Sequence, residues 1–185
     1  MLMILLASSY LQVDETPTLC LQHHKKCYMW VYAAFKQDRR PKLVMFDFQT
    51  TRGKIAVNTM LHGYQGIVQT DGYGGYNALR QGPDIIGIGC GAHIRRKFAA
   101  VQHLAAGAAP IAKQVLARFQ ELYAIEAEIR EHNLDPEPSK QLRQERALPI
   151  ISNLQQELLA AQAKTPPQSA LGKAINYALW SYWTQ

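Results

Sequence analysis

The sequence predicts an α/β protein in which a mixed five-stranded sheet, flanked by helices, is followed by a helical subdomain. In the first half of the chain, short apolar runs rich in aromatic and β-branched residues indicate strands. In the second half, apolar residues recur every three or four positions, which is typical of helices. We therefore divide the chain into a core domain over residues 1–107 and a helical region over residues 108–185.

Three strands are expected to open the core domain. The first carries Asp14, the second covers Tyr28 to Phe35, and the third covers Lys42 to Phe48. The polar cluster from His23 to Lys26 is expected to form the loop between the first two strands. Trp30, Tyr32 and Phe35 are interpreted as core and partner-strand contacts, with base stacking as the alternative. Short connections of this kind favour antiparallel pairing, so we expect a three-stranded meander.

Helices and strands alternate in the rest of the core domain. We expect a helix over Ile55 to Leu61, a strand over Gly66 to Thr70, a helical turn over Tyr76 to Leu79, a buried strand over Ile85 to Cys90, and a helix from His93. Strands joined through helices pair in parallel, so two parallel strands should extend the meander. The predicted order is β-β-β-α-β-α-β-α.

The helical region is expected to contain three helices. The first ends near Asn133 to Pro136, where proline prevents the helix from continuing, and the second covers Lys140 to Ala163. Ser169 is placed to cap the third helix. The apolar stripe of that third helix consists of Leu171, Ile175, Ala178, Leu179 and Tyr182. This stripe runs to the last residues without a stop signal, so the chain is expected to be cut and not completed.

Composition limits the classes of protein that the chain could represent. It has 185 residues, of which 48% are hydrophobic, so one domain with a real core is expected. The net charge of +6 favours polyanionic partners such as nucleic acid, although many proteins with similar charge bind none. Cys20, Cys27 and Cys90 give no disulfide framework, which favours a reducing cytoplasm. The apolar segment from Met1 to Ala7 is too short to span a bilayer, so no membrane partner is expected.

Two aspartates are candidate metal ligands. Asp14 and Asp71 each follow an apolar strand-like run, and their carboxylates would converge if the two strands were neighbours, about 4.8 Å apart. Carboxylate oxygens suit Mg²⁺ or Mn²⁺. The alternative is that both are ordinary turn residues, since Asp71 precedes glycine and Asp14 lies shortly before Thr16 and Pro17.

A second candidate site follows the last predicted strand. Arg95, Arg96 and Lys97 lie in the first turns of a predicted helix, where cations and backbone amides can bind phosphate. The alternative is a solvated helix face. Cys90 and His93 could suggest a zinc site or a thiol nucleophile, but no second Cys/His pair has matching spacing and no orienting group is evident.

These residues closely resemble the transposases of the bacterial insertion sequence 66 family over nearly the whole chain. The similar segments, in order, are Leu11–Pro17 (LQVDETP), Met29–Tyr32 (MWVY), Gly66–Tyr76 (GIVQTDGYGGY), Gly89–Phe98 (GCGAHIRRKF), Leu122–Glu126 (LYAIE) and Ser169–Leu179 (SALGKAINYAL). So many landmarks in order make a chance similarity very improbable.

The resemblance implies a ribonuclease H-like catalytic domain with a DDE acid triad, followed by a helical insertion. It implies that Asp14 and Asp71 are the first two catalytic acids and the metal ligands, with Mg²⁺ or Mn²⁺ as cofactor. Cys90 and His93 then form the Cys-x-x-His signature beside the active site, and Arg95, Arg96 and Lys97 contact DNA. The implied partners are transposon-end DNA and further copies of the chain, in the bacterial cytoplasm.

The sequence departs from the family pattern in two ways that affect function. Gly91 stands where the family usually has tryptophan, and the family's third acid lies in an Asn-Asn-x-x-Glu-Arg segment that would follow Gln185. The upstream zinc module and DNA-binding helices are also expected to be missing. We therefore expect a truncated transposase fold that is not competent in strand transfer alone. The alternatives are a non-enzymatic DNA-binding or oligomerising remnant, or rescue by Glu121 or Glu126.

Overall fold

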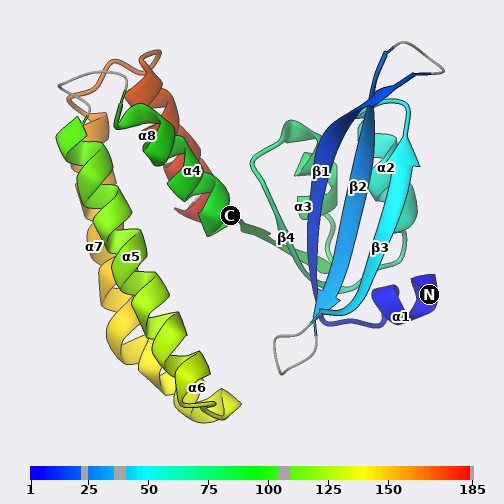
Figure 1. Cartoon of the computed structure of the whole chain (residues 1–185), viewed down its shortest axis with the longest axis horizontal. Helices are drawn as coiled ribbons and strands as arrows, with labels where there is room; N and C mark the ends of the chain where they lie inside the picture. The colour runs from blue at the N-terminus through cyan, green and yellow to red at the C-terminus, as the bar shows by residue number, and fades with distance from the viewer. Residues whose placement is uncertain (22–24, 36–40, 104–108, 184–185) are drawn as a thin grey trace. The chain divides into compact units, whose positions relative to one another are not determined.

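The computed structural model describes residues 1–21, 25–35, 41–103 and 109–183. The chain forms two compact units that divide between Cys90 and Gly91. The first unit is built on a sheet and the second contains only helices in its described part (Figure 1). The predicted fold class, a mixed sheet with flanking helices followed by further helices, is therefore confirmed.

The sheet of the first unit has five strands in the order β3-β2-β1-β4-β5. Strands β1 (Tyr10–Cys20), β2 (Lys25–Phe35) and β3 (Pro41–Gln49) form an antiparallel meander. Strand β4 (Gly66–Thr70) pairs in parallel with β1, and β5 (Ile85–Gly89) pairs in parallel with β4. The predicted mixed sheet and its order of elements are confirmed.

Helices cover one face of this sheet. Helix α1 (Leu2–Leu6) precedes β1, α2 (Lys54–Met60) connects β3 to β4, and the turn η1 (Gly74–Tyr76) with α3 (Asn77–Arg80) connects β4 to β5. In Figure 1, α2 and α3 both lie behind the sheet. The core on this side contains Leu5, Leu11, Val13, Trp30, Tyr32, Ala34, Val57, Leu61, Tyr64, Val68, Tyr76 and Leu79.

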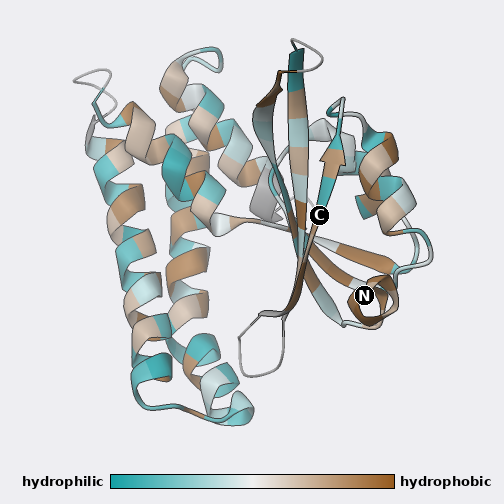
Figure 2. Ribbon diagram, turned by 45° about the vertical axis from the view of Figure 1, so that its right-hand side comes forward, coloured by the Kyte–Doolittle hydropathy of each residue, from teal (hydrophilic) through white to brown (hydrophobic). Residues whose placement is uncertain are grey.

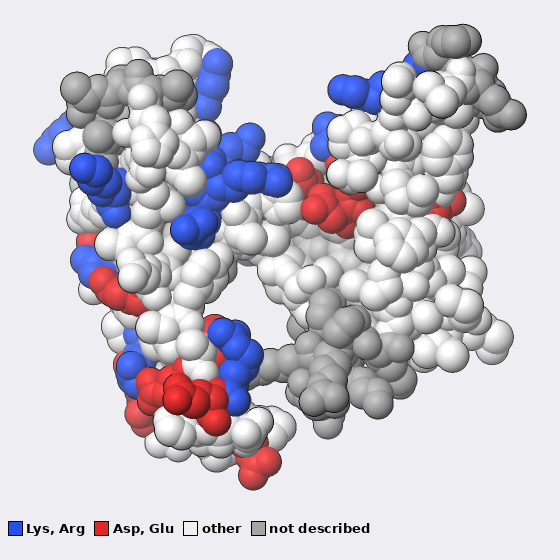
Figure 3. All heavy atoms as spheres, in the orientation of Figure 1, with Lys and Arg blue, Asp and Glu red and all other residues white. Residues whose placement is uncertain are grey.

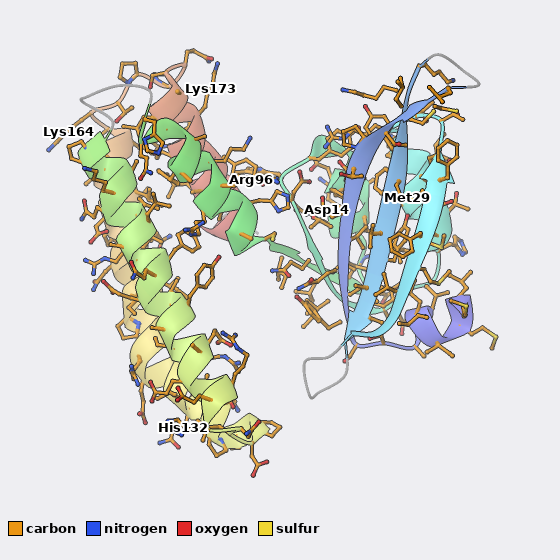
Figure 4. All side chains as sticks on the ribbon, viewed as in Figure 1. Asp14, Met29, Arg96, His132, Lys164 and Lys173 are labelled. Atoms are coloured by element: carbon orange, nitrogen blue, oxygen red, sulfur yellow. The ribbon has the colours of Figure 1, made fainter. Side chains whose placement is uncertain are left out.

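The opposite face of the sheet carries Asp14 and Met29, which are both labelled in Figure 4. Apolar side chains on this face remain exposed, including Phe46 and Phe48 of the edge strand β3. Strand β5 was predicted to be buried, and this prediction was wrong, since Ile86 is 64% exposed. The reason is that β5 is the other edge strand and only one face of the sheet is covered.

The start of β2 differs from the prediction. Lys25 and Lys26 belong to this strand and pair with Cys20 and Leu19 of β1, whereas the sequence placed them in a loop. His23 and His24 lie outside the described residues. The hairpin pairing extends the strand because a ladder continues as long as its backbone groups find partners, whatever the polarity of the side chains.

The second unit is a packed set of helices. Its main elements are α4 (Gly91–Val101), α5 (Ala109–Glu131), α7 (Leu148–Gln162) and α8 (Ala170–Trp183). Figure 2 shows hydrophobic and hydrophilic positions alternating along these helices. Their buried faces form a single core of Ile94, Phe98, Val101, Ala112, Val115, Phe119, Leu154, Leu158, Ala161, Leu171, Ala174, Ile175, Ala178 and Leu179.

Helix ends in the second unit follow the predicted signals closely. Asn133 adopts a left-handed conformation (φ 48°) after α5, and the Leu134 amide donates to the Ile129 carbonyl (3.1 Å). The next helical segment begins with α6 (Pro136–Leu142), earlier than predicted, because proline is tolerated in the first turn of a helix. It continues without a break through the π-helical turn η2 (Arg143–Ala147) into α7.

The predicted cap of the last helix is also confirmed. The Ser169 hydroxyl accepts a hydrogen bond from the Gly172 amide at 3.0 Å, at the start of α8. Of the predicted apolar stripe, Leu171, Ile175, Ala178 and Leu179 are buried, while the side chain of Tyr182 lies outside the described part of the structure.

The compact units divide ahead of the predicted domain boundary at 107/108. Helix α4 belongs to the second unit because Ile94, Phe98 and Val101 pack into the helical core. The division into a catalytic domain and an insertion at 107/108 stays a prediction. None of the helices in the described ranges is both long and apolar enough to cross a membrane.

Candidate active site

Strand register places the two predicted acids at matching positions. The parallel ladder between β1 and β4 ends with Gln12 opposite Gln69. Asp14 and Asp71 each follow their glutamine by two residues, since 14 − 12 = 71 − 69. Side chains two residues apart point to the same face of a strand. The side-chain amide of Gln12 donates to the Gln69 side-chain oxygen at 2.7 Å, so side chains at this level do meet across the two strands.

Asp14 lies on the open face of the sheet, in the middle of β1 and opposite Val31 of β2. It was predicted at the carboxyl end of its strand, which was wrong, because β1 continues to Cys20 in its hairpin with β2. The paired residues of β1 and β4 end at Gln12, two residues before Asp14. Its Oδ1 accepts a hydrogen bond from the Glu15 amide at 3.0 Å.

Asp71 directly follows β4 and organises the turn that comes after it. Its Oδ1 accepts a hydrogen bond from the Tyr73 amide at 2.9 Å, as in an Asx turn. The Arg80 guanidinium donates to the Asp71 carbonyl and to the Thr70 hydroxyl. Gly87 of β5 makes room for this arginine, since a Cβ there would lie 2.5 Å from Arg80 Cγ. The turn role proposed from the sequence is therefore real, and it fixes the carboxylate in one orientation.

Cys90 lies at the same level as Asp71 on the other side of β4. Its amide donates to the Thr70 carbonyl at 3.0 Å, directly after the pairing of Thr70 with Gly89. Asp71 and Cys90 thus directly follow the neighbouring strands β4 and β5, and Asp14 lies within β1, the strand next to β4.

A cluster of polar side chains precedes the two acids in β1 and β4. The Tyr10 hydroxyl donates to the Gln69 side-chain oxygen at 2.6 Å and accepts from the Gln12 amide group at 2.8 Å. Burial raises the pKa of Tyr10, the hydrogen bond from Gln12 lowers it, and electrostatic interaction with the nearby Cys90 raises it further. The phenol is therefore a neutral hydrogen-bonding group at physiological pH, and it orders the surroundings of the acid pair.

The predicted residues after Cys90 lie in α4 of the second unit. Ile94 and Phe98 bury one side of the helix, while Arg95, Arg96 and Lys97 are exposed. Figure 4 shows Arg96 extending away from the helix. The Lys97 ammonium lies 5.1 Å from the ring centroid of Tyr177 on α8, within cation–π range. His93 occupies the first turn of α4 and is half-buried.

Charge in the second unit is divided along the chain in a way that the sequence reading overlooked. Residues 91–120 and 158–185 contain seven Lys and Arg and no Asp or Glu, whereas residues 121–157 contain eight acids and four basic residues. Figure 3 shows acidic side chains gathered toward the α6 end of the unit and basic side chains toward α4 and α8. A simple count of charge by segment would have revealed this pattern.

The glutamates considered as substitutes for a third acid are occupied in ion pairs within the second unit. Glu126 accepts two hydrogen bonds from Arg143, at 2.6 and 3.0 Å. Glu121 pairs with Arg118 at 3.2 Å. Across the described ranges, no group of three His, Cys, Asp or Glu side chains is placed to hold a metal ion.

The donor set at the acid pair nevertheless fits a hard divalent cation. Asp14 and Asp71 supply carboxylate oxygens two residues after Gln12 and Gln69, the last paired residues of β1 and β4, whose side chains bond one another. Oxygen ligands are those that Mg²⁺ and Mn²⁺ prefer. Two carboxylates leave further coordination positions of such a cation for other ligands.

Comparison with known proteins decides the family. The sequence model described as "Transposase IS66 family" matches residues 1–185. The chain belongs to this transposase family. The predicted resemblance is confirmed, and membership supports a transposase-like function.

Similar proteins of this family occur in Sinorhizobium fredii (strain NBRC 101917 / NGR234). "Uncharacterized protein y4qI" is 32% identical over 180 residues, which cover 90% of this chain and 33% of the relative. "Uncharacterized protein y4jD" is 32% identical over 170 residues, covering 86% of this chain and 32% of the relative. The chain thus spans about a third of the length of these relatives. No solved structure matches the chain.

The site also contains residues that the sequence reading missed. Glu15, Arg52, Tyr73 and Tyr76 form a network of hydrogen bonds beneath the acid pair. The one available signal was strand alternation, which directs Glu15 to the face opposite Asp14 and so into the core.

Proposed function

We propose that this chain contributes part of the catalytic domain of a DNA transposase and that Asp14 and Asp71 hold Mg²⁺ or Mn²⁺ for phosphoryl transfer on DNA. The observation that carries this proposal is the matching register of the two acids across β1 and β4, in a chain of the IS66 transposase family. The turn that fixes the Asp71 carboxylate supports a ligand role as well as a turn role.

Bound divalent ions would activate a water or 3′ hydroxyl and stabilise the leaving oxygen of a DNA phosphodiester. The residues of the chain orient the reacting groups. Asp14 and Asp71 would supply the ligand oxygens. The hydrogen bonds among Tyr10, Gln12 and Gln69 would hold the preceding parts of β1 and β4 in place, and Cys90 would contribute its thiol next to Asp71. A Cys90 and His93 role beside the active site stays a prediction from the family resemblance.

Complete strand transfer requires a third carboxylate in this scheme, and the described residues do not supply one beside the pair. The 185-residue chain alone is therefore proposed to bind the cation and DNA without efficient cleavage. Homo-oligomer formation and a place in the bacterial cytoplasm stay predictions.

Isothermal titration with Mn²⁺ tests this proposal. Asp14→Asn and Asp71→Asn should each weaken Mn²⁺ binding by tenfold or more. Asp84→Asn is the matched control, because Asp84 is an exposed aspartate that precedes β5 in the same unit, at the opposite end of that strand from Cys90. Equal Mn²⁺ affinity for all three variants and the parent chain would refute the metal site.

A second candidate function is DNA binding without chemistry. It is favoured by the exposed Arg95, Arg96 and Lys97 on α4 and by the absence of acids from residues 91–120. Cations of this kind bind the phosphate backbone regardless of base sequence. Salt-sensitive binding of duplex DNA that is independent of Mn²⁺ and unaffected by Asp71→Asn would favour this function over the first.

A further inference from the structure

A buried carboxylate lies directly beneath the candidate site. Glu15 follows Asp14 in β1, and strand alternation turns its side chain to the opposite, helix-covered face of the sheet. The Glu15 side chain is only 1% exposed. Burying a carboxylate costs desolvation free energy unless charged and hydrogen-bonding partners compensate for it. The partners of Glu15 therefore indicate its role.

Two side chains satisfy this carboxylate. Arg52 donates to Oε1 through Nε at 2.7 Å and through a second guanidinium nitrogen, and the Tyr76 hydroxyl donates to Oε2. Burial raises the pKa of the Tyr76 phenol, and the hydrogen bond to Glu15 raises it further. Burial lowers the pKa of Arg52, but the hydrogen bond and charge of Glu15 outweigh this and raise it overall. The network is thus an anion held by a cation and a neutral phenol.

The same arginine is joined to the turn that contains Asp71. Its guanidinium carbon lies 3.8 Å from the ring centroid of Tyr73, and the Tyr73 hydroxyl donates to the Arg52 carbonyl at 2.8 Å. The Tyr73 amide in turn donates to Oδ1 of Asp71 at 2.9 Å. Tyr73 therefore contacts Arg52 through its side chain and Asp71 through its backbone.

Aromatic packing makes this connection stiff. The Tyr73 and Tyr76 rings meet edge to face with centroids 5.9 Å apart, and Tyr76 meets Trp30 in the same manner at 5.8 Å. Trp30 lies opposite Glu15 in the β1–β2 ladder. The group that orients Asp71 is thereby anchored to the strand that carries Asp14.

We propose that Glu15 is a positioning residue that, through Arg52 and Tyr73, fixes the Asp71 carboxylate for cation binding. The inference rests on the proposed function of Asp14 and Asp71 as metal ligands. Glu15 itself is not a ligand, because its carboxylate is paired with Arg52 on the face opposite Asp14. Its role is exerted through the turn that follows β4.

Two readouts of the Glu15→Gln chain test this proposal. The first is the hydrogen-exchange rate of the Tyr73 amide, measured by NMR without metal, which we expect to rise about tenfold relative to the parent chain as the bond to Asp71 loosens. The second is Mn²⁺ affinity by titration, which we expect to fall about tenfold. The matched control is Glu126→Gln, which breaks the ion pair with Arg143 in the second unit and should change neither readout.

A double variant separates positioning from stability. Glu15→Gln combined with Arg52→Met removes both charges, so stability should largely recover while the Tyr73 amide still exchanges fast and Mn²⁺ affinity stays low. Recovery of all three quantities would overturn the positioning role and leave a purely structural ion pair.

A milder variant keeps the test valid if Glu15→Gln fails to fold. Tyr73→Phe retains the ring beside the Arg52 guanidinium but loses the hydrogen bond to the Arg52 carbonyl. The hydrogen-exchange rate of the backbone amide at position 73 should rise about threefold. An unchanged amide exchange rate in a folded Glu15→Gln or Tyr73→Phe chain would overturn the proposal. If the parent chain binds no Mn²⁺, the metal site fails, and amide exchange still decides whether Glu15 orders the turn.

Discussion

The two units of this chain use charge in different ways. In the first unit, Glu15 is buried and joined to Arg52 and Tyr76 beneath the candidate acids. In the second unit, the ion pairs Arg143–Glu126 and Arg146–Glu128 lie at the surface, outside an apolar core. The helical unit is thus stabilised mainly by apolar packing, whereas part of the sheet unit's stability depends on buried polar groups that also hold the turn after β4.

The largest effect should come from the apolar core of the second unit. Phe98 is fully buried in α4, so Phe98→Ala should lower the free energy of unfolding of this unit by about 3–5 kcal/mol. Arg95→Ala on the exposed face of the same helix should change it by less than about 0.5 kcal/mol. Urea unfolding followed by circular dichroism measures both, and similar losses for the two variants would show that apolar packing is not what stabilises this unit.

The next largest effect should come from the buried carboxylate of the first unit. Arg52→Met leaves Glu15 without its cation and should destabilise that unit by about 2–3 kcal/mol, less than for a fully buried pair because Arg52 is 40% exposed. Arg143→Met in the second unit should cost about 0–1 kcal/mol, since its pair with Glu126 lies at the surface. Equal costs in urea unfolding would show that the two units do not differ in this respect.

DNA affinity should depend on the second unit's cations. Replacing Arg95, Arg96 and Lys97 together by glutamine should weaken duplex DNA binding at moderate salt about tenfold, or about 1.4 kcal/mol. The slope of log Kd against log salt should fall by about 2–3, because fewer counterions are released. Fluorescence anisotropy across salt concentrations measures this. Replacing Arg130, Lys140 and Arg146 in the acid-rich segment is the charge-matched control, and an equal loss there would refute the assignment.

Alkaline pH should affect the first unit through its buried tyrosines. Burial raises the pKa of Tyr64 to about 12, and burial also raises the pKa of Tyr32 and Tyr76. A phenol whose pKa is raised by folding contributes its full stability below about pH 10, and that contribution is lost as pH rises toward the folded pKa. We expect the first unit to lose about 1 kcal/mol per buried tyrosine for each pH unit above 10.

Tyr64→Phe provides the control for this pH effect. It removes one titrating group together with the hydroxyl's hydrogen bond to the Ile67 carbonyl. The free energy of unfolding should therefore fall less steeply with pH above pH 10. Chemical unfolding at pH 8 and pH 11 measures the difference. If the free energy of unfolding falls equally between pH 8 and pH 11 in the variant and in the parent chain, the Tyr64 phenol does not cause the loss of stability.

Much of this architecture could be predicted from the sequence because it depends on local patterns. Periodicity identified the order of strands and helices, Ser169 identified the cap of α8, and the apolar runs before Asp14 and Asp71 indicated two strands. The exposure of β5 could not be predicted, since it depends on which strand forms the edge of the sheet.

Other features depend on contacts between distant parts of the chain. Arg52 lies 37 residues from Glu15, and Tyr76 lies 61 residues from it, so no local pattern connects them. Helix α4 likewise belongs to the helical unit because Phe98 packs into the core of that unit, a contact that no local pattern predicts. The candidate ligands were therefore visible in sequence, whereas the groups that orient them were not.

The most direct test of the central claim is NMR line broadening during titration with Mn²⁺. If Asp14 and Asp71 share a cation, substoichiometric Mn²⁺ should broaden the backbone amides of Gln12 to Glu15 and of Gln69 to Tyr73 together, while amides of α7 remain sharp. Broadening confined to one of the two strands, or spread evenly over both units, would contradict a metal site formed by this pair.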